Sequence, residues 1–435
     1  MKKSYFSLLL FCEILLSVNL YAQQPNIDYV NQLNKESAEL RNSDGTASLL
    51  AAEKALEIAE KIKYKSGIAT AQRYIGIIYF YSGEYKIAEN HYLKSLELFR
   101  QLNDSNGLFD CNNNLGYLYL QSGDYKKADF YFNKAFSIAL LTANKENMSS
   151  IQLNRGMLYF QQGLFLKALE CYKISYYLDY ERKAYDEVMF SLNNIGLVYD
   201  LLEQFPEAIN NFYEAYLIAY NANNKIMQAK LLNNIGKSLN SMGYYQLAFD
   251  FLNNAIVIRD EINDKPGMLI TLFNFGQLYH NLNLFDKEAE TYHLALKIAE
   301  ETDDQRNIAV CLNMIGMNLI RKKNYQQAMS YFNESIRLAE EIDVLPEKIM
   351  NYEQMAIASF YSGNSNQAYY YYNNYKTLYD SLRKMDTTFV LPNKTAVTTK
   401  NTKINSQKNN LFSLIYIPLL LGLIFILIKS YRKKH

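Results

Sequence analysis

Glycine recurs with a fixed period of forty residues, and this regularity constrains the fold more than any other feature of the sequence. The positions form an unbroken series, which we call the rung glycines: Gly76, Gly116, Gly156, Gly196, Gly236, Gly276 and Gly316. Their neighbours repeat too, since the pentapeptide LNNIG occurs at both 192–196 and 232–236. Self-similarity at a period of about 20 to 50 residues is typical of arrays in which each repeat is one supersecondary unit. The sequence therefore predicts an extended array.

Three further rows share the period and define the unit. The first row is aromatic and follows the rung glycine by nine residues: Tyr85, Tyr125, Phe165, Phe205, Tyr245, Phe285 and Tyr325. The second row is alanine, three residues further on: Ala88, Ala128, Ala168, Ala208, Ala248 and Ala328. The third row is aromatic again: Tyr92, Phe132, Tyr172, Phe212, Tyr292, Phe332 and Tyr372. Apolar residues lie at helical spacing around each rung, so each unit reads as helix, short turn, helix. A glycine inside a helix costs about 1 kcal/mol relative to alanine. We expect the compensation to be close approach of the second helix, which a missing side chain permits.

The order Gly-x-x-Tyr, then Gly-x-Tyr/Phe-x-x-Ala, then an aromatic residue resembles the tetratricopeptide repeat (TPR). The resemblance covers about residues 27–386, and we assign residues 23–386 to about nine 40-residue units, the first and last of them degenerate. The usual unit has about 34 residues, and the longer unit resembles the variant of the kinesin light chain and of bacterial peptide-sensing regulators. HEAT repeats share the length without the Gly/Tyr/Ala order. The resemblance implies an all-α fold, a TPR-type helical-hairpin solenoid that winds into a right-handed superhelix with a concave groove.

Both ends of the chain carry membrane signals. Residues 1–22 have the layout of a signal peptide, with Lys2 and Lys3 before an apolar run and cleavage after Ala22. Residues 411–428, LFSLIYIPLLLGLIFILI, are uncharged. As a helix with about 1.5 Å rise per residue they would be about 27 Å long, close to the thickness of the hydrocarbon core of a bilayer, so they predict a transmembrane helix. The basic tail 429–435 is expected in the cytoplasm, and residues 387–410, rich in Thr, Asn and Lys, are expected to be a flexible linker. The sequence predicts a single-pass membrane protein whose array lies outside the cytoplasm, on the periplasmic or cell-surface side.

Composition and motifs argue against several classes of function. The 45 basic and 44 acidic residues balance, which gives no electrostatic reason to expect nucleic acid as a partner. The chain has no GxGxxG, HExxH, GxSxG or CxxC motif, and its four histidines are scattered. We therefore expect no enzyme, no cofactor and no metal. Cys111 and Cys311 occupy one position of two distant units, so we expect the cysteines to pack as small apolar residues.

One polar row stands out on the first helix of the unit. The position two residues before the rung, the −2 row, points about 150° away from the apolar stripe at ~100° per residue. It holds Asn114, Asn154, Asn194, Asn234 and Asn274. In proteins that the array resembles, first helices line the concave face and asparagines near this position hold the backbone of an extended peptide, for which an amide has both donor and acceptor. The alternative stays open that these asparagines bridge adjacent helices or face water in an Asn-rich chain.

The same geometry predicts further groove-lining residues, namely Phe160, Phe190, Asp200, Lys230, His280 and Arg321. This surface is aromatic and amide-rich with few charges, which favours a neutral or mildly apolar peptide over a phosphate or nucleic acid. The sequence thus predicts a membrane-tethered TPR module for protein–protein interaction that binds a peptide or protein segment of unknown identity. The alternative function is the input, or sensor, component of a membrane signalling system. It would act through a separate output partner, since only residues 429–435 follow the predicted membrane helix.

Overall fold

The computed structural model describes residues 26–385 of the chain. The predicted signal peptide (1–22), linker (387–410), membrane helix (411–428) and basic tail (429–435) lie outside the described residues. Within residues 26–385, no helix is both long enough and apolar enough to cross a bilayer.

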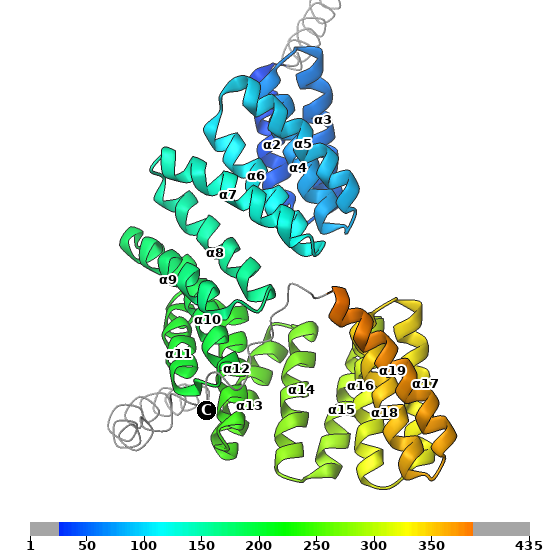
Figure 1. Cartoon of the computed structure of the whole chain (residues 1–435). Helices are drawn as coiled ribbons and strands as arrows, with labels where there is room; N and C mark the ends of the chain where they lie inside the picture. Colours follow the sequence, from blue (N-terminus) through cyan, green and yellow to red (C-terminus); the bar gives the residue numbers. More distant parts are fainter. Residues whose placement is uncertain (1–25, 386–435) are drawn as a thin grey trace, which may run out of the picture. The chain divides into compact units, whose positions relative to one another are not determined.

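The described part of the chain is entirely helical, with no β-strand (Figure 1). Its eighteen helices are α2 (Ile27–Leu40), α3 (Gly45–Lys61), α4 (Lys65–Tyr81), α5 (Tyr85–Leu102), α6 (Ser105–Gln121), α7 (Tyr125–Leu141), α8 (Lys145–Gln161), α9 (Phe165–Arg182), α10 (Tyr185–Leu201), α11 (Phe205–Asn221), α12 (Lys225–Ser241), α13 (Tyr245–Glu261), α14 (Lys265–Asn281), α15 (Phe285–Glu301), α16 (Gln305–Arg321), α17 (Tyr325–Glu341), α18 (Leu345–Tyr361) and α19 (Ser365–Met385). The even-numbered helices are the first helices of the units, and those from α4 to α16 carry the rung glycines. The prediction of an all-α array of helical hairpins is confirmed.

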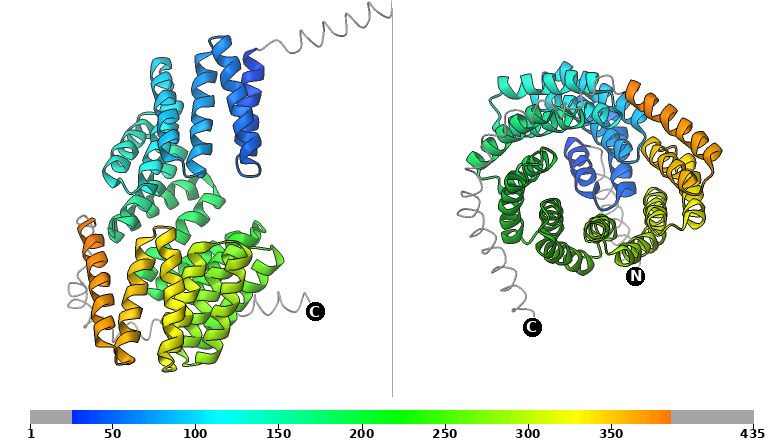
Figure 2. Two further views of the ribbon diagram at one scale, coloured as in Figure 1. Left: turned by 90° about the vertical axis from the view of Figure 1, so that its right-hand side faces the viewer. Right: turned by 60° about the horizontal axis from the view of Figure 1, so that its bottom comes forward.

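The chain divides into two compact units between Leu158 and Tyr159, inside α8. The N-terminal unit, residues 26–158, contains the hairpins α2/α3, α4/α5 and α6/α7. The C-terminal unit, residues 159–385, contains α9 and the hairpins α10/α11, α12/α13, α14/α15, α16/α17 and α18/α19. In the C-terminal unit these five hairpins stand side by side along an arc (Figure 2).

Every helix from α3 to α18 is followed by a residue in the left-handed conformation, one every twenty residues from 63 to 363. Five of these are glycines with φ of 69–82°, Gly83, Gly123, Gly163, Gly243 and Gly363. Glycine takes this conformation without the steric cost that a Cβ brings. Aspartate or asparagine then caps many of the following helices; the Asp104 carboxylate, for example, accepts from the backbone N–H groups of Asn106 and Gly107.

The rung glycines are where the two helices of a hairpin touch. A Cβ built on Gly116 would lie 2.4 Å from the Phe132 ring, and one on Gly276 would lie 2.4 Å from the Tyr292 ring. The same second aromatic row covers Gly76, Gly196 and Gly316, while Leu252 covers Gly236. Each of these six glycines thus admits a large side chain from the second helix, as expected from the sequence.

Small residues complete the core of each unit. Ala88, Ala128, Ala168, Ala208, Ala248 and Ala328 are all fully buried. Cys111, Cys171 and Cys311 are buried, and burial raises the pKa of the Cys111 thiol to about 12. These cysteines pack as small apolar residues, as the sequence predicts.

Successive first helices contact one another, as in the pairs α2–α4, α4–α6, α12–α14 and α16–α18. Within residues 26–385, no two second helices approach each other as closely. Because the first helices lie closer together, each unit curves toward them. The −2 asparagines therefore occupy the inner side of each curve, where the resemblance to TPR proteins places a groove.

Candidate functional site

Five side-chain amides form a continuous hydrogen-bonded run across three first helices of the C-terminal unit. Asn193 on α10 donates to the Asn194 oxygen at 3.2 Å and accepts from Nδ2 of Asn234 on α12 at 3.1 Å. Asn233 repeats this arrangement, accepting from Nδ2 of Asn274 on α14 at 2.9 Å and lying 3.5 Å from the Asn234 oxygen. We call these five residues the amide ladder. It links α10, α12 and α14 along the inner side of the unit.

The two asparagines of each LNNIG segment have different roles. Asn193 and Asn233, three residues before the rung, are 2% and 3% exposed and brace the interface between hairpins. Asn194, Asn234 and Asn274, in the −2 row, are half-buried and keep part of their surface open to solvent. Asn234 and Asn274 each donate to an asparagine of the preceding hairpin, 41 residues earlier. This pairing explains why both asparagines recur together.

The N-terminal unit has one link of the same kind, in which Asn154 donates to the Asn113 oxygen at 2.7 Å. Asn114 has no such link, because the residue 41 positions earlier is Arg73, whose guanidinium has no acceptor. The Nδ2 atom of Asn114 is buried without a hydrogen-bond partner among the described residues. The ladder is therefore continuous only over α10, α12 and α14.

Each −2 amide retains hydrogen-bonding capacity after its ladder bonds are made. A side-chain amide has two N–H donors and two acceptor lone pairs, and the ladder uses one donor of Asn274 and one acceptor site of Asn194. The remaining donors and lone pairs belong to side chains that are half-exposed on the inner side of the unit. Because the ladder fixes each amide, these groups are held in place before any ligand arrives.

Apolar side chains and one lysine flank the ladder near the beginnings of the same helices. Phe190 on α10 and Ile270 on α14 are 44% and 55% exposed, and Lys230 on α12 is exposed between them in the repeat order. Partial burial of its amine and the positive charge of Arg259 lower the pKa of Lys230. The buried Arg259 guanidinium lies 3.9 Å from the nearest Asp264 carboxylate oxygen and is paired with it, so Lys230 is the exposed cation beside the ladder.

Asp200 lies on the other side of the ladder and is committed to a polar network. Its carboxylate is 7% exposed, accepts from the Ser238 hydroxyl at 2.6 Å and lies 2.8 Å from the Lys237 ammonium. The next link along is formed by Asn281, which donates to the Asn240 oxygen at 3.0 Å. Both networks join neighbouring first helices and leave no isolated charge.

His280 and Arg321 meet at Glu288, a carboxylate that occupies the alanine row. Glu288 is 2% exposed, and its Oε1 atom lies 2.8 Å from Nη1 of Arg321 and 3.6 Å from Nδ1 of His280. Asn318 donates to the other carboxylate oxygen at 3.1 Å. This cluster satisfies a buried charge on α15 with partners from the two neighbouring first helices, α14 and α16.

Phe160 differs from the other predicted groove residues because it packs within the chain, its half-buried ring meeting Phe165 edge-on at 5.7 Å between centroids. The structure thus places Asn194, Asn234, Asn274, Phe190 and Lys230 on one inner surface. It holds Asp200, His280 and Arg321 in polar networks beside that surface.

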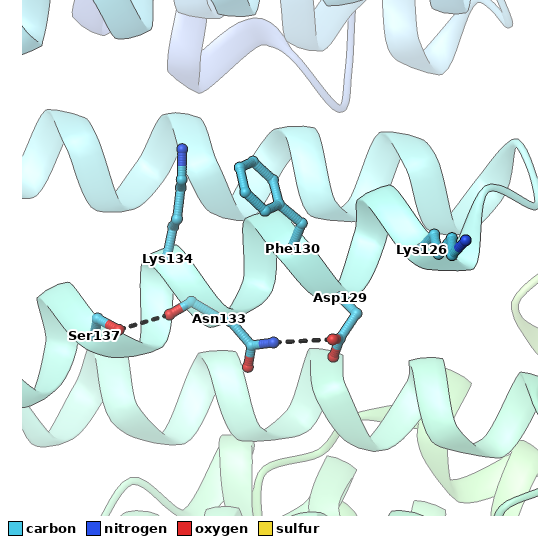
Figure 3. Close-up of a pocket in the computed structure, with 6 residues that line it drawn as sticks. All are labelled: Lys126, Asp129, Phe130, Asn133, Lys134 and Ser137. Atoms are coloured by element: carbon cyan, nitrogen blue, oxygen red, sulfur yellow. Dashed lines mark hydrogen bonds between the residues drawn. The ribbon is translucent and has the colours of Figure 1, made fainter.

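A shallow hollow of about 370 Å³ lies on the N-terminal unit, over the second helix α7. Its lining comes entirely from one face of that helix: Lys126, Asp129, Phe130, Asn133, Lys134 and Ser137 (Figure 3). The Lys134 ammonium lies over the Phe130 ring at 4.2 Å, and Asn133 donates to Asp129 at 2.9 Å. These internal contacts leave a single-helix surface with no convergent polar groups, so we do not assign it a function.

Sequence reasoning missed the partners that hold the site. Lys237 and Ser238 fix Asp200, Glu288 fixes Arg321, and Asn318 in turn holds the Glu288 carboxylate. One signal was visible: a glutamate at position 288 where every other unit has a small residue. A buried acid in a small-residue row requires basic or amide partners nearby. Among residues 26–385, no group of three or more His, Cys, Asp or Glu side chains could hold a metal ion.

Stacked helical hairpins of one length, curved toward their first helices, define the class of solenoid repeat proteins. A tetratricopeptide-repeat family model matches residues 67–140 and 147–220, and another matches residues 309–342. The array and these matches together identify the chain as a TPR protein. No curated protein sequence matches it.

Solved structures share the fold at low sequence identity. Aspartyl phosphate phosphatase F from Bacillus subtilis is 17% identical with a TM-score of 0.55, covering 80% of this chain and 93% of its own. A Rap protein complexed with competence and sporulation factor is 13% identical with a TM-score of 0.54, covering 82% of this chain and 99% of its own. The quorum sensor NprR from B. thuringiensis, in its apo form, is 14% identical with a TM-score of 0.55, covering 81% and 97%.

Proposed function

We propose that this chain is a membrane-tethered interaction module that binds an extended peptide segment across α10, α12 and α14 of its C-terminal unit. The observation that carries the proposal is the amide ladder, which holds Asn194, Asn234 and Asn274 half-exposed on the inner side of the array. Similarity of fold to a Rap protein solved with competence and sporulation factor supports a peptide or protein as the class of ligand.

The ladder suits a peptide backbone more than a particular side chain. The backbone of every non-proline residue offers one N–H and one C=O, and a fixed amide can meet both. Each bond contributes only about 0.5–1.5 kcal/mol net, so a useful affinity requires several rungs and apolar contacts. Phe190 and Ile270 supply apolar surface beside the ladder. The exposed Lys230 ammonium favours an acidic side chain between two apolar ones.

The substitution Asn194→Asp tests the backbone contact with little change to the ladder. Aspartate keeps the oxygen that accepts from Asn193, but it replaces the donor NH₂ with a charged acceptor. The probe is a peptide selected from a random phage-displayed library on the purified chain. We expect the affinity for that peptide to fall by about tenfold or more, because a lost hydrogen bond and a repelled carbonyl cost about 1.5–3 kcal/mol.

The matched control is Asn253→Asp, the same change at an exposed asparagine of the second helix α13. This variant should bind the peptide like the unchanged chain. Equal affinities for all three proteins would refute the amide contact, whereas equal losses in both variants would point to a general charge effect.

We also propose that residues 411–428 tether the array outside the cytoplasm. The uncharged 18-residue segment and the basic residues after it support this placement. Protease added to spheroplasts of expressing cells should digest the array while an epitope tag fused after His435 stays protected. Digestion of the tag, or recovery of the chain in the soluble fraction, would contradict the tether.

A second proposal is that peptide binding serves as the input of a signalling system. Its support is the similarity of fold to the quorum sensor NprR and to aspartyl phosphate phosphatase F. If so, crosslinking in membranes should join the chain to a separate protein with an output domain, in an amount that changes when the selected peptide is added. A ligand-independent crosslinking pattern would favour simple capture.

A further inference from the structure

The last helix of the array, α19, exposes the face that second helices elsewhere keep covered. Four of its residues form one stripe, Tyr369, Tyr372, Lys376 and Tyr379, which we call the α19 seam. Tyr369, Tyr372 and Tyr379 are 69%, 49% and 41% exposed, and Lys376 is exposed as well. Forty residues earlier in α17, the positions of Tyr372 and Tyr379 are held by Phe332 and Ala339, both fully buried.

Within its own hairpin Phe332 packs on Gly316, whereas Tyr372 has Ala356 at the matching position. A following hairpin accounts for the rest of this difference. Phe332 and Ile336 of α17 lie in one apolar cluster with Met355 and Ala358 of α18, the first helix of the next hairpin. The same holds in α11, where Phe212, Tyr216 and Ala219 are buried and Phe212 shares a cluster with residues of α12. The α19 seam is thus an interface between hairpins that lacks its next hairpin within residues 26–385.

Repeat arrays remain soluble when their end helices present a polar outer face. The first described helix, α2, does so with exposed Asn31, Lys35 and Glu39. The seam instead presents tyrosine rings. Beneath them lies the half-buried ring of Tyr375, whose centroid is 6.1 Å from that of Tyr372 and 5.7 Å from that of Tyr379. An aromatic surface of this kind is typical of an interaction site and not of a solvated cap.

The spacing of the seam identifies the kind of surface that fits it. Its residues follow one another by three, four and three positions, the spacing with which one helix packs along another. The sequence after α19 offers no such helix, because residues 386–410 have no apolar stripe with a helical period. A second α19 has the required stripe. In addition, the predicted membrane segment begins only 25 residues after α19, which would confine the seams of different copies to one layer beside the bilayer.

The charge on the seam selects the direction of pairing. In a parallel pair Lys376 would face its own copy, and like charges at such a contact are destabilising. In an antiparallel pair with its twofold axis beside Asn374, Tyr369 faces Tyr379 of the second copy and Tyr372 faces Lys376 of the second copy. The second contact places an ammonium on a tyrosine ring, which is favourable.

We propose that α19 is a self-association surface, on which α19 of a second copy of this chain packs antiparallel along Tyr369, Tyr372, Lys376 and Tyr379. The pair would be isologous, with the same surface used by both copies. This dimer is independent of the peptide contact on α10, α12 and α14, since different helices are involved.

Cysteine crosslinking tests the pairing in membranes of cells that express the full chain. Two differently tagged copies, one with Tyr369→Cys and one with Tyr379→Cys, are co-expressed and oxidised. We expect a mixed disulfide dimer that is about tenfold more abundant than dimers of either variant alone. The control pair uses Tyr370→Cys with Tyr379→Cys, because Tyr370 is 61% exposed on another face of the helix. A mixed dimer as abundant in the control pair, or no mixed dimer, would overturn the proposal.

Charge insertion gives an independent test. Tyr372→Asp should lower the association constant of the dimer by about tenfold, as measured by sedimentation equilibrium on the detergent-solubilised full chain. The helical circular dichroism should stay unchanged. Tyr370→Asp, the same change off the seam, should leave the association constant unaltered. If the chain without substitutions sediments as a monomer, or if both variants lower the association constant equally, a second copy does not cover this face.

Discussion

The close approach at the rung glycines makes a quantitative prediction for Gly116→Ala. A Cβ at this position would lie 2.4 Å from Cδ1 and 2.5 Å from Cε1 of Phe132, whereas carbon atoms pack best at about 3.5–4.0 Å. The ring must therefore move by about 1 Å, and it is fully buried. Overpacking of this kind costs about 1–3 kcal/mol.

Helix propensity acts in the opposite direction. Replacing a helical glycine with alanine gains about 1 kcal/mol when nothing else changes, so we expect a net loss of about 1–2 kcal/mol in the free energy of unfolding. Urea unfolding followed by far-ultraviolet circular dichroism measures this difference. Gly45→Ala is the control, because no atom lies within 4 Å of a Cβ at that helical position; it should be neutral or stabilising.

A double-mutant cycle separates the clash from other effects. In the hairpin of the second LNNIG segment a leucine, Leu252, covers the rung, and its nearest atom lies 2.8 Å from the Cβ position. In a Phe132→Leu background Gly116→Ala should therefore cost less, with a coupling energy of about 0.5–1 kcal/mol or more. If Gly116→Ala stabilises the chain as much as Gly45→Ala does, our explanation of the glycine period is wrong.

Three further outcomes are expected. Ala143→Gly should raise the free energy of unfolding by about 1 kcal/mol, because Ala143 holds a φ of 48° where a Cβ is costly; a lower melting temperature would contradict this. Cys111 and Cys311, whose pKa values burial raises to about 12, should resist iodoacetamide at about pH 8 in the folded chain and react in urea, as mass spectrometry would show. Arg321→Ala should destabilise the chain by about 3 kcal/mol or more, since it strands the buried Glu288 carboxylate. Glu288→Ala, which restores the alanine row and leaves half-exposed Arg321 to water, should cost clearly less in the same urea assay.

Much of the fold could be predicted from the sequence because each repeat solves the same packing problem. The pair formed by Gly196 and Phe212, for example, recurs in nearly every unit. Comparison of the repeats within this one chain therefore shows which positions are needed for packing. The left-handed turns were harder to find. Glu203 and Lys323 occupy positions where other units have glycine, and nothing in those residue types indicates a positive φ.

The candidate site could be predicted only in part. The sequence placed the −2 asparagines away from the core, and the structure shows them half-exposed. The structure also shows that Asn234 and Asn274 bridge neighbouring hairpins, the role that sequence reasoning set against ligand binding as an alternative. Both roles fit one residue, because an amide can bond on two edges. The 41-residue link was missed because single-helix geometry says nothing about which neighbouring side chain an amide reaches.

The central claim, that the amide ladder reads a peptide backbone, is tested most directly by chemical changes to the ligand itself. The peptide selected from the random library is synthesised with a single backbone N-methyl group or a single alanine at each position, and every affinity is measured by titration calorimetry. The account predicts that N-methylation at two or more central positions weakens binding by about tenfold or more, and that this penalty shrinks on the Asn194→Asp chain. Uniformly tolerated N-methyl groups, with affinity lost only in the alanine series, would contradict it.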